Sequence, residues 1–450
     1  MKRNFVNRFL SWYKKIQVSK SPQMNLVWGF FLYNLIGVAL LSIPVFHKSH
    51  VSFLDNLFIS TSAISTTGLV TVSVVDSYNI FGQIIIMLLF QFGGIGYMTL
   101  TSYYLFLTTK KITNWHEKII GTEFTMPKTI LVIDFLKTVV LFTLVTEIIG
   151  AICFFIAFKN PDEGVFQVIW YSVFHSVSAF CTAGFALFND SFEGFQDNRS
   201  INSIISVLSI AGSLGFIVFT DVWYRISGKS KSVTFTSKII IYGFLILLSS
   251  GTILLYLTEP LVHQSGTSAL MKSFFKAMTA MTTVGFNTVS TGALTIQSLL
   301  LVVFLMYIGA SPSGTAGGMK ITTLTAMIAV LKSRIFGQKD ITFLNNRIPF
   351  ERLYVATSTF ILYTSLIFLF TFLLMFSEKA VFENILFEVA SALGTVGLST
   401  GITGDLSPIG KILIIMLMFI GRVGVLTFGF ALLARKQSNQ SGYIENDLAV

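Results

Sequence analysis

The chain has 450 residues, of which 53% are hydrophobic and only 12% are charged, and its mean hydropathy is +0.75. Soluble domains carry about 25% charged residues, so this composition excludes a water-soluble fold of this length. The formal net charge of +10 is divided among short basic segments between apolar runs, which favours loops beside membrane lipid over a nucleic-acid surface.

The chain begins with a basic segment, residues 1–24, and continues into an apolar run at 26–46 that is too long for a signal-peptide core. Four blocks then follow, at 25–108, 129–226, 236–335 and 352–436, and a tail at 437–450 ends the sequence. Each block opens with an apolar helix, expected at about 25–46, 130–158, 237–258 and 353–376. Each closes with a second apolar helix, expected at about 79–108, 201–224, 295–335 and 409–434.

About 20 residues span a hydrocarbon core roughly 30 Å thick, so these runs predict eight transmembrane helices. Lys and Arg concentrate at 2–20, 110–128, 225–238, 332–352 and 435–436, whereas acidic residues concentrate at 162–197 and 378–405. By the positive-inside rule the basic segments are cytoplasmic. Both termini are therefore expected in the cytoplasm.

The middle of each block carries one motif, [ST]-A-x-x-T-x-G-[LF], at 62–69, 178–185, 279–286 and 391–398. Each motif ends a segment too short to cross the bilayer, at about 54–65, 167–181, 269–282 and 381–394. Because both flanking helices cross, each short segment must enter and leave on the outer side. Small residues in membrane helices usually serve packing, but four turns in register favour four re-entrant pore helices around one axis.

The residues of these turns suit a cation. Glycine permits backbone angles that aim carbonyl oxygens at the axis, and threonine adds a hydroxyl, so a ring of such turns can replace the ion's water shell. The preceding helices would direct the negative ends of their dipoles toward the same point. We therefore expect an all-α membrane protein with four helix, pore helix, filter loop, helix repeats around a central pore.

A second landmark, G-x-x-G followed by an apolar residue, occurs at 93–97, 212–216 and 421–425, with Gly309 in the matching place of the third block. It follows the T-x-G glycine by 25, 28, 24 and 24 residues. Close helix packing is the role expected for it.

The third block differs from the others. Its second helix would be about 40 residues long, twice the length that a span needs, and residues 309–318 interrupt it with glycines and Pro312. Proline removes a helical hydrogen bond, so we predict a helix broken inside the membrane, with either a passive kink or a loop there. Two charges, Arg422 and Glu147, lie within apolar runs and need a cavity or a partner.

In its four ordered motifs the chain resembles the superfamily of potassium transporters that contains the Trk, Ktr and plant high-affinity proteins. Its size, eight crossings and short C-terminal tail resemble the KtrB-type membrane subunit of bacterial Ktr potassium uptake systems. The resemblance covers about residues 25–436. It implies potassium uptake through one pore per subunit in a bacterial cell membrane, with no enzyme activity.

The resemblance implies a selectivity filter that binds K⁺ at its glycines. The filter residues are Thr66, Thr67, Gly68, Thr182, Ala183, Gly184, Thr283, Val284, Gly285, Thr395, Val396 and Gly397. In the family, glycine at all four key positions accompanies potassium transport, whereas serine in the first accompanies sodium preference. One glycine per loop implies a short filter with imperfect discrimination against Na⁺.

The resemblance also implies an intramembrane gate loop within 309–320, beneath the filter. The gate residues are Ser311, Pro312, Ser313, Gly314, Thr315, Ala316, Gly317 and Gly318, with Lys320 at the inner margin and Arg422 beside the loop. Arg422 is expected to bond the loop carbonyls or to repel a passing cation.

The partners that the resemblance implies are a second copy of the chain and a cytosolic ring of nucleotide-binding, RCK-type subunits of the KtrA or KtrC kind. The sequence contains neither a P-loop nor a strand followed by G-x-G-x-x-G, so nucleotide is expected only on that ring, and no covalent cofactor is expected. Basic loops such as 332–352 are either its docking surface or ordinary solvated loops. Sodium is either coupled to transport or an activator.

Two other functions stay open on the sequence. A sodium- or proton-coupled secondary carrier usually has inverted repeats, which four parallel repeats disfavour. A membrane enzyme would need convergent His, Asp or Cys at membrane depth, but His175 alone lies in an apolar helical segment and is expected to be packed or hydrogen-bonded. Cys153 and Cys181 are expected to serve packing.

Overall fold

The computed structural model describes residues 22–96, 99, 102–103, 131–158, 164–263 and 269–433. The basic segment before residue 22, the basic loop at 110–128 and the predicted tail at 437–450 lie outside these residues. The described part of the chain is mostly helical. Its strands are two short pairs, β1 (Ile308–Gly309) parallel with β2 (Met319–Lys320) and β3 (Thr342–Phe343) antiparallel with β4 (Asn346–Arg347).

The same three elements recur four times in chain order. The first is a long helix: α2 (Pro22–Leu41), α8 (Val132–Ala157), α12 (Phe235–Thr258) and α16 (Phe350–Ser377). The second is a short pore helix: α3 (Phe53–Ile64), α9 (Val165–Phe180), α13 (Ala269–Thr282) and α17 (Phe382–Gly394). The third is α5 (Ile80–Ile95), α10 (Arg199–Leu214), α14 (Ile296–Tyr307) and α18 (Pro408–Val423).

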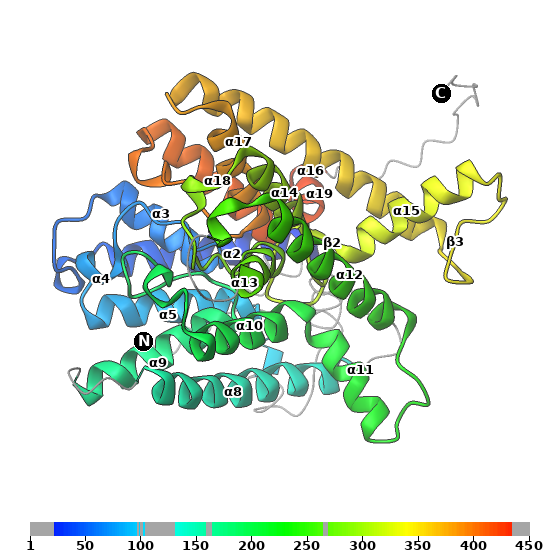
Figure 1. The fold of residues 1–450 in the computed structure, drawn as a ribbon, viewed down its shortest axis with the longest axis horizontal. Coiled ribbons are helices and arrows are strands. Elements are labelled where there is room, and N and C mark those ends of the chain that lie inside the picture. The colour runs from blue at the N-terminus through cyan, green and yellow to red at the C-terminus, as the bar shows by residue number, and fades with distance from the viewer. Residues whose placement is uncertain are drawn as a thin grey trace, which may run out of the picture.

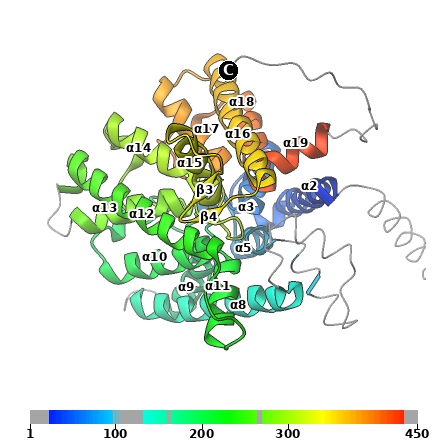
Figure 2. The same cartoon turned by 90° about the vertical axis from the view of Figure 1, so that its right-hand side faces the viewer.

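The repeats succeed one another around the molecule. In Figure 1 the first repeat lies at the left, the second along the bottom and the fourth at the top, with α13 and α14 of the third across the middle. In Figure 2 the repeats surround a central region, and the colour passes from the blue α2 and α5 through the cyan α8 and the green α13 to the orange α16 and α17. The first and last repeats are neighbours, because α18 packs against α3. The fourfold arrangement expected from the motifs is therefore present.

The long helices carry the surface that faces lipid. By length and composition α2, α8, α12 and α16 are able to cross a membrane, and two bent pairs raise the number of candidate spans in the described residues to as many as six. Large apolar side chains such as Ile148, Ile246 and Phe368 are more than half exposed on these helices. Apolar exposure of this extent is expected only where lipid, rather than water, is the solvent.

The second helices are broken where unbroken spans were predicted. Helix α10 ends before Gly215 and α11 (Phe216–Ile226) leaves it at 87°, while α18 ends before Gly424 and α19 (Val425–Leu433) leaves it at 97°. Helix α5 likewise ends at Gly96. The three glycines have φ of +87°, +92° and +86°, a left-handed conformation that ends an α-helix. The predictions of continuous helices at 79–108, 201–224 and 409–434 were therefore wrong.

The first glycine of each landmark has the packing role that was expected. A Cβ atom added to Gly93, Gly212 or Gly421 would lie less than 3.0 Å from the backbone carbonyl oxygen of Ile64, Phe180 or Leu393. These three carbonyls belong to the last or second-last residue of the pore helix of the same repeat. Glycine thus lets each second helix contact its pore helix directly, immediately below the filter.

Glu147 is buried in α8 and has partners from two repeats. Gln91 Nε2 on α5 donates a hydrogen bond to Glu147 Oε2 at 3.1 Å, and Cys181 Sγ lies 3.8 Å from Glu147 Oε1. Cys181 also donates to Gln91 Oε1 at 3.2 Å, so this cysteine does more than fill space. The group links repeat 1 to repeat 2 below the filter turn.

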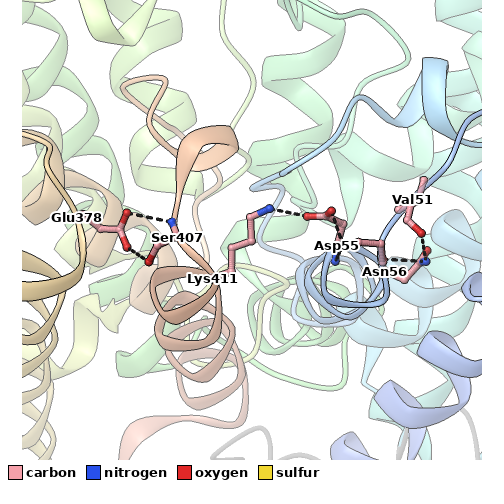
Figure 3. A network of polar contacts seen from close by, with 7 residues as sticks. Val51, Asp55, Asn56, Glu378, Ser407 and Lys411 are labelled. Atoms are coloured by element: carbon pink, nitrogen blue, oxygen red, sulfur yellow. Dashed lines mark hydrogen bonds and ion pairs between the residues drawn. The ribbon is translucent and has the colours of Figure 1, made fainter.

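An ion pair joins the two ends of the ring of repeats. Lys411 Nζ, near the start of α18, lies 2.7 Å from Asp55 Oδ1, near the start of α3, as Figure 3 shows. Both side chains are largely buried. On the other side of α18, Glu378 accepts hydrogen bonds from the Ser407 backbone N–H and hydroxyl and so caps that helix.

Replacing Lys411 with Met should lower the stability of the folded chain by about 1–3 kcal/mol, because Asp55 loses a charge-assisted hydrogen bond. We expect the midpoint of thermal unfolding in detergent to fall by about 2–4 °C. The control is Lys379→Met, since Lys379 is exposed. Equal midpoints for both variants would show that the ion pair contributes nothing.

The same ion pair predicts the direction of a pH effect. Burial raises the pKa of Asp55, but hydrogen bonds from Lys411 and Ser52 outweigh burial and leave the pKa below its ordinary value of 3.8. The carboxylate therefore stabilises the fold fully above that value and loses its contribution as the pH falls through the lowered pKa. Unfolding midpoints measured for wild type and Lys411→Met should converge in strong acid.

Candidate ion-conducting site

The four T-x-G turns share one backbone conformation. Each threonine has a left-handed φ, +50° at Thr66, +50° at Thr182, +55° at Thr283 and +48° at Thr395. A left-handed φ is uncommon for a β-branched residue, so its recurrence indicates that the surroundings impose it. In every repeat the next residue donates its backbone N–H to the carbonyl of the first motif residue. These bonds are Thr67 to Ser62, Ala183 to Ser178, Val284 to Thr279 and Val396 to Ser391, at 2.8, 2.8, 3.2 and 2.8 Å.

The glycines of the four T-x-G turns, which were predicted to form the filter, make a closed ring. A Cβ atom added to each of them would lie less than 3.0 Å from a carbonyl oxygen of the next repeat. The pairs run in order around the ring: Gly68 with Ala183, Gly184 with Val284, Gly285 with Val396, and Gly397 with Thr67. The ring therefore closes from the fourth repeat back onto the first, with no space for a side chain at these four positions.

The first residue of each motif braces its filter turn, a role that the consensus alone did not reveal. Ser62 and Ser391 accept hydrogen bonds from the backbone N–H groups of Gly68 and Gly397, both at 3.1 Å. In the other two repeats the hydroxyls donate instead. Ser178 bonds the carbonyl of Phe185 at 2.8 Å, and Thr279 bonds that of Phe286 at 2.9 Å.

On the side of the ring that the positive-inside rule predicts to face out lies an outer vestibule of about 350 Å³, which the glycines of all four T-x-G turns line. Asp190 and Glu193 also line it and give it acidic character. Burial raises the pKa of Glu193 and the neighbouring Asp190 adds to the rise, while Lys276 opposes both. A cleft lined by acidic groups raises the local concentration of cations.

Below the ring lies a larger cavity of about 740 Å³, and the predicted gate loop forms part of its wall. Pro312, Gly314, Ala316, Gly317, Gly318, Lys320 and Arg422 all line this cavity. The loop joins α14 to α15 (Ile321–Ile335), and the parallel pairing of β1 with β2 holds its two ends together. The loop thus begins and ends at the same place beneath the T-x-G turns.

The loop contacts the filter threonines directly. Thr182 Oγ1 donates to Thr315 Oγ1 at 3.0 Å, and the Gly317 backbone N–H donates to Thr283 Oγ1 at 3.0 Å. Among the described residues, the hydroxyls of Thr66 and Thr395 are buried without a hydrogen-bond partner. The loop therefore forms hydrogen bonds with two of the four threonines and none with the other two, although Gly317 packs against Thr395.

The loop also forms hydrogen bonds with the backbone at the break in the second helix of repeat 2. The carbonyls of Ser213 and Gly212 accept the N–H groups of Ser311 and Thr315 at 3.2 and 3.1 Å. In return, Phe216 N–H donates to the Ser313 carbonyl at 3.2 Å and Ile217 N–H donates to the Ser313 hydroxyl at 3.0 Å. A helix break frees backbone groups of this kind, and here the loop satisfies them.

Two cations hold the loop from below. Arg422 donates to the carbonyl of Thr315 and, through its other terminal nitrogen, to the carbonyls of Gly93 and Gly94. Lys320 Nζ donates to the carbonyls of Ala316 and Gly317 at 2.7 and 2.9 Å. Arg422 thus donates to a loop carbonyl, which is one of the two roles expected of it, and its contact with repeat 1 is an addition.

Comparison with known proteins places this geometry in a family. The family model described as TrkH, cation transport protein, matches residues 19–444. The chain belongs to the TrkH family of cation transport proteins. It is 35% identical to the potassium/sodium uptake protein NtpJ of Enterococcus hirae, over 96% of this chain and 97% of that protein. It is 33% identical to the Ktr system potassium uptake protein B of Bacillus subtilis, over 93% of this chain and 94% of that protein.

The fold of this TrkH-family chain also resembles a solved structure. The crystal structure of the potassium transporter TrkH from Vibrio parahaemolyticus superimposes with a TM-score of 0.74, at 20% sequence identity, over 92% of this chain and 85% of that chain. At this identity the match establishes the fold alone. It confirms the expected helical architecture.

The structure brings together the residues that the sequence of this TrkH-family chain predicted for a filter and a gate: the four glycines form one ring, and the loop at 311–318 contacts Thr182 and Thr283. The residues that the sequence reasoning missed are the backbone partners of the gate: Gly212 and Ser213 in repeat 2, and Gly93 and Gly94 in repeat 1. The G-x-x-G landmark contained the signal, since its second glycine permits the break that exposes these groups.

His175 does not face the inner cavity. Its Nδ1 bonds the Tyr171 carbonyl at 2.8 Å, and its Nε2 accepts the Leu187 N–H at 3.1 Å.

Proposed function

We propose that this TrkH-family chain takes up potassium through the ring of four T-x-G turns. One observation carries the proposal: each filter glycine abuts a carbonyl of the next repeat, and the fourth closes onto the first. Packing of helices needs no such closed ring. A ring of backbone carbonyls around an axis is the arrangement that replaces the hydration shell of a dehydrated cation.

The relatives support potassium as the transported ion. NtpJ of Enterococcus hirae is named a potassium/sodium uptake protein, and the Ktr system protein of Bacillus subtilis is named a potassium uptake protein. Both match nearly the whole length of this chain. Glycine at all four filter positions agrees with potassium preference, and the single glycine layer makes discrimination against Na⁺ incomplete.

The filter would work by electrostatics. The pore helices end at Ile64, Phe180, Thr282 and Gly394, next to the filter threonines, so the negative ends of their dipoles lie beside the ion path. The acidic vestibule attracts cations to the outer face, and the free hydroxyls of Thr66 and Thr395 offer ligands at the inner face. A cation is stabilised along this path, whereas an anion is repelled.

The loop at 311–318 would act as the gate, in its closed position here. It bonds two filter threonines and the break in repeat 2, and Arg422 and Lys320 hold its carbonyls. Opening requires that these bonds be exchanged for bonds to water, at a net cost of about 1 kcal/mol for each bond, and the inner cavity adjoins the loop on the side where that exchange would occur. The alternative of a passive kink would not need contacts with both the filter and three repeats.

The assembly we propose is a homodimer on a cytosolic ring of nucleotide-binding, RCK-type subunits. The name Ktr system, carried by the Bacillus subtilis relative, supports a system with separate components. Helix α15 continues from the gate loop and ends in the exposed basic residues Lys332 and Arg334, so movement of a docked ring would reach the gate through one helix. By the positive-inside rule this side is cytoplasmic, as are both termini.

Potassium-uptake complementation tests the function. Expression in a bacterial strain that lacks its own potassium uptake systems should restore growth at low potassium, and co-expression of a Ktr ring subunit should increase uptake further. The control is Gly285→Leu, which places a side chain on the Val396 carbonyl and should block the ring. Growth that is equal for the wild type and Gly285→Leu would contradict the proposal.

A further inference from the structure

One position behind the filter carries a polar, ionisable side chain in three of the four repeats. It lies seven residues before the filter threonine, and its occupants are Ile59, His175, Lys276 and Glu388. All four are buried in pore helices, with exposed fractions of 0%, 0%, 3% and 1%. A buried lysine and a buried glutamate are costly unless their polar atoms are paired. Because these side chains occupy equivalent positions in their repeats, we expect them to share a role.

Each of the three polar side chains spans from its pore helix to the loop that follows the filter. In repeat 3, Lys276 Nζ donates to Asn287 Oδ1 at 3.1 Å, to the Val289 carbonyl at 3.0 Å and to Thr291 Oγ1 at 2.8 Å. An ammonium group has three hydrogens, and all three are used. The loop after the third filter turn is therefore tied to the pore helix at three points.

Repeat 4 uses the opposite charge for the same connection. Glu388 Oε1 accepts hydrogen bonds from the hydroxyls of Ser399 and Thr403, the latter at 2.8 Å, and these two hydroxyls bond each other at 2.9 Å. Ser399 and Thr403 occupy the places, four and eight residues after the filter threonine, that Asn287 and Thr291 occupy in repeat 3. The two loops are held at equivalent points by different chemistry.

Repeat 2 uses a neutral histidine and repeat 1 uses apolar packing. His175 Nε2 accepts the Leu187 N–H, so the hydrogen lies on Nδ1, which bonds the Tyr171 carbonyl, and the ring also stacks on Phe188 at 4.8 Å. In repeat 1, Ile59 belongs to the same buried apolar cluster as Val74, eight residues after the filter threonine. Repeats 2, 3 and 4 thus fix the outer loop from the same pore-helix position, which in repeat 1 is occupied by a buried apolar residue.

We propose that His175, Lys276 and Glu388 are positioning residues that set the radius and rigidity of the outer filter, and through it the preference for K⁺ over Na⁺. The loops they hold begin directly after the filter glycines, and Asn287, Thr291, Ser399 and Thr403 line the outer vestibule. Because each glycine abuts the next repeat, displacement of one loop shifts a carbonyl in the ring. These residues touch the loop rather than the ion, so they act through the filter backbone.

The test compares sodium and rubidium uptake by purified variants in proteoliposomes. Lys276→Met keeps the length of the side chain but removes the three donors, and Glu388→Leu removes the acceptor. Each should raise the ratio of sodium to rubidium uptake on the order of fivefold, because buried loop groups lose their partners. Glu388→Gln keeps an amide oxygen that accepts hydrogen bonds from Ser399 and Thr403, so its ion ratio should stay close to that of the wild type. A role that depends on the negative charge alone would instead predict the same change as in Glu388→Leu.

Changes on the loop side keep the test independent of the folding of the pore-helix variants. Thr291→Val and Thr403→Val remove the opposite ends of the same bonds and should shift the ratio in the same direction. The control is Thr258→Val, the same change at an exposed helix end. The double variant Glu388→Leu with Thr403→Val should change the ratio no more than Glu388→Leu alone, because both remove one connection.

The inference rests on the proposed function, and the outcomes separate the two. A wild-type chain that carries no rubidium would overturn the proposed function and the inference with it. A selective wild type whose folded Thr291→Val and Thr403→Val variants keep the same ion ratio would overturn the inference alone. So would a Glu388→Gln variant that loses selectivity as fully as Glu388→Leu.

Discussion

Deletion of Gly314 to Gly318 should raise the basal flux of rubidium through the purified chain by about tenfold or more. The deletion removes the Thr315 bond to Thr182 and the Gly317 bond to Thr283, and it also removes the loop carbonyls to which Arg422 and Lys320 donate. A net contribution of about 1 kcal/mol for each lost hydrogen bond is enough to shift a closed population toward an open one by this factor. Flux into proteoliposomes, without a regulatory ring, measures the effect.

Arg422→Ala tests the same gate with a smaller change. It removes the hydrogen bonds to Thr315, Gly93 and Gly94 while the loop itself stays, so flux should rise in the same direction but less than in the deletion. The matched control is Arg199→Ala, at the exposed start of α10, which should leave flux unchanged. If the deletion and Arg422→Ala both conduct at the wild-type rate, the loop is not a gate.

Gly68→Ser should lower potassium uptake by about tenfold and raise the ratio of sodium to potassium uptake. A serine Cβ at this position would lie less than 3.0 Å from the Ala183 carbonyl oxygen, and φ at Gly68 is +93°, which an L side chain rarely adopts. The backbone must move, and the carbonyl that it displaces belongs to the ring. A ring altered in this way loses the fit to K⁺ and holds the ion less selectively.

The matched control for this change is Gly404→Ser. Gly404 also lines the outer vestibule, but a Cβ added there meets nothing within 4 Å. Gly404→Ser should therefore keep both the rate and the ion preference of the wild type. A Gly68→Ser variant that is equally unaffected would place the filter elsewhere in the chain.

Much of the fold was predictable because membrane helices and repeats leave strong signals in sequence. The long apolar runs identified α2, α8, α12 and α16, and the recurrence of T-x-G located all four filter turns. Lipid imposes both signals, since a spanning helix needs a minimum apolar length and irregular backbone must be buried inside the protein.

The helix breaks at Gly215 and Gly424 were not predictable in the same way. A glycine inside an apolar run is compatible with close packing in a continuous helix and also with a left-handed break. The choice depends on contacts that form only in the folded chain. At Gly215 the deciding partner is the gate loop, which lies about 100 residues further along the sequence and satisfies the freed backbone groups.

The buried side chains behind the filter were missed for a related reason. His175 was expected to be packed or hydrogen-bonded, and it is both. Lys276 and Glu388 were not singled out, because each is a single charge in a short amphipathic segment. Their partners lie 11 to 15 residues away, across the filter turn, so no helical or strand periodicity connects them. Alignment of the four repeats on the filter threonine makes the shared position visible.

Rubidium flux into proteoliposomes that contain only this chain tests the central claim most directly. With an inward-negative membrane potential and no sodium or proton gradient, we predict saturable rubidium uptake that potassium suppresses more strongly than sodium does. Uptake that requires a sodium or proton gradient would instead indicate a coupled carrier. Absence of uptake under every gradient, by protein that is folded and correctly inserted, would contradict the account.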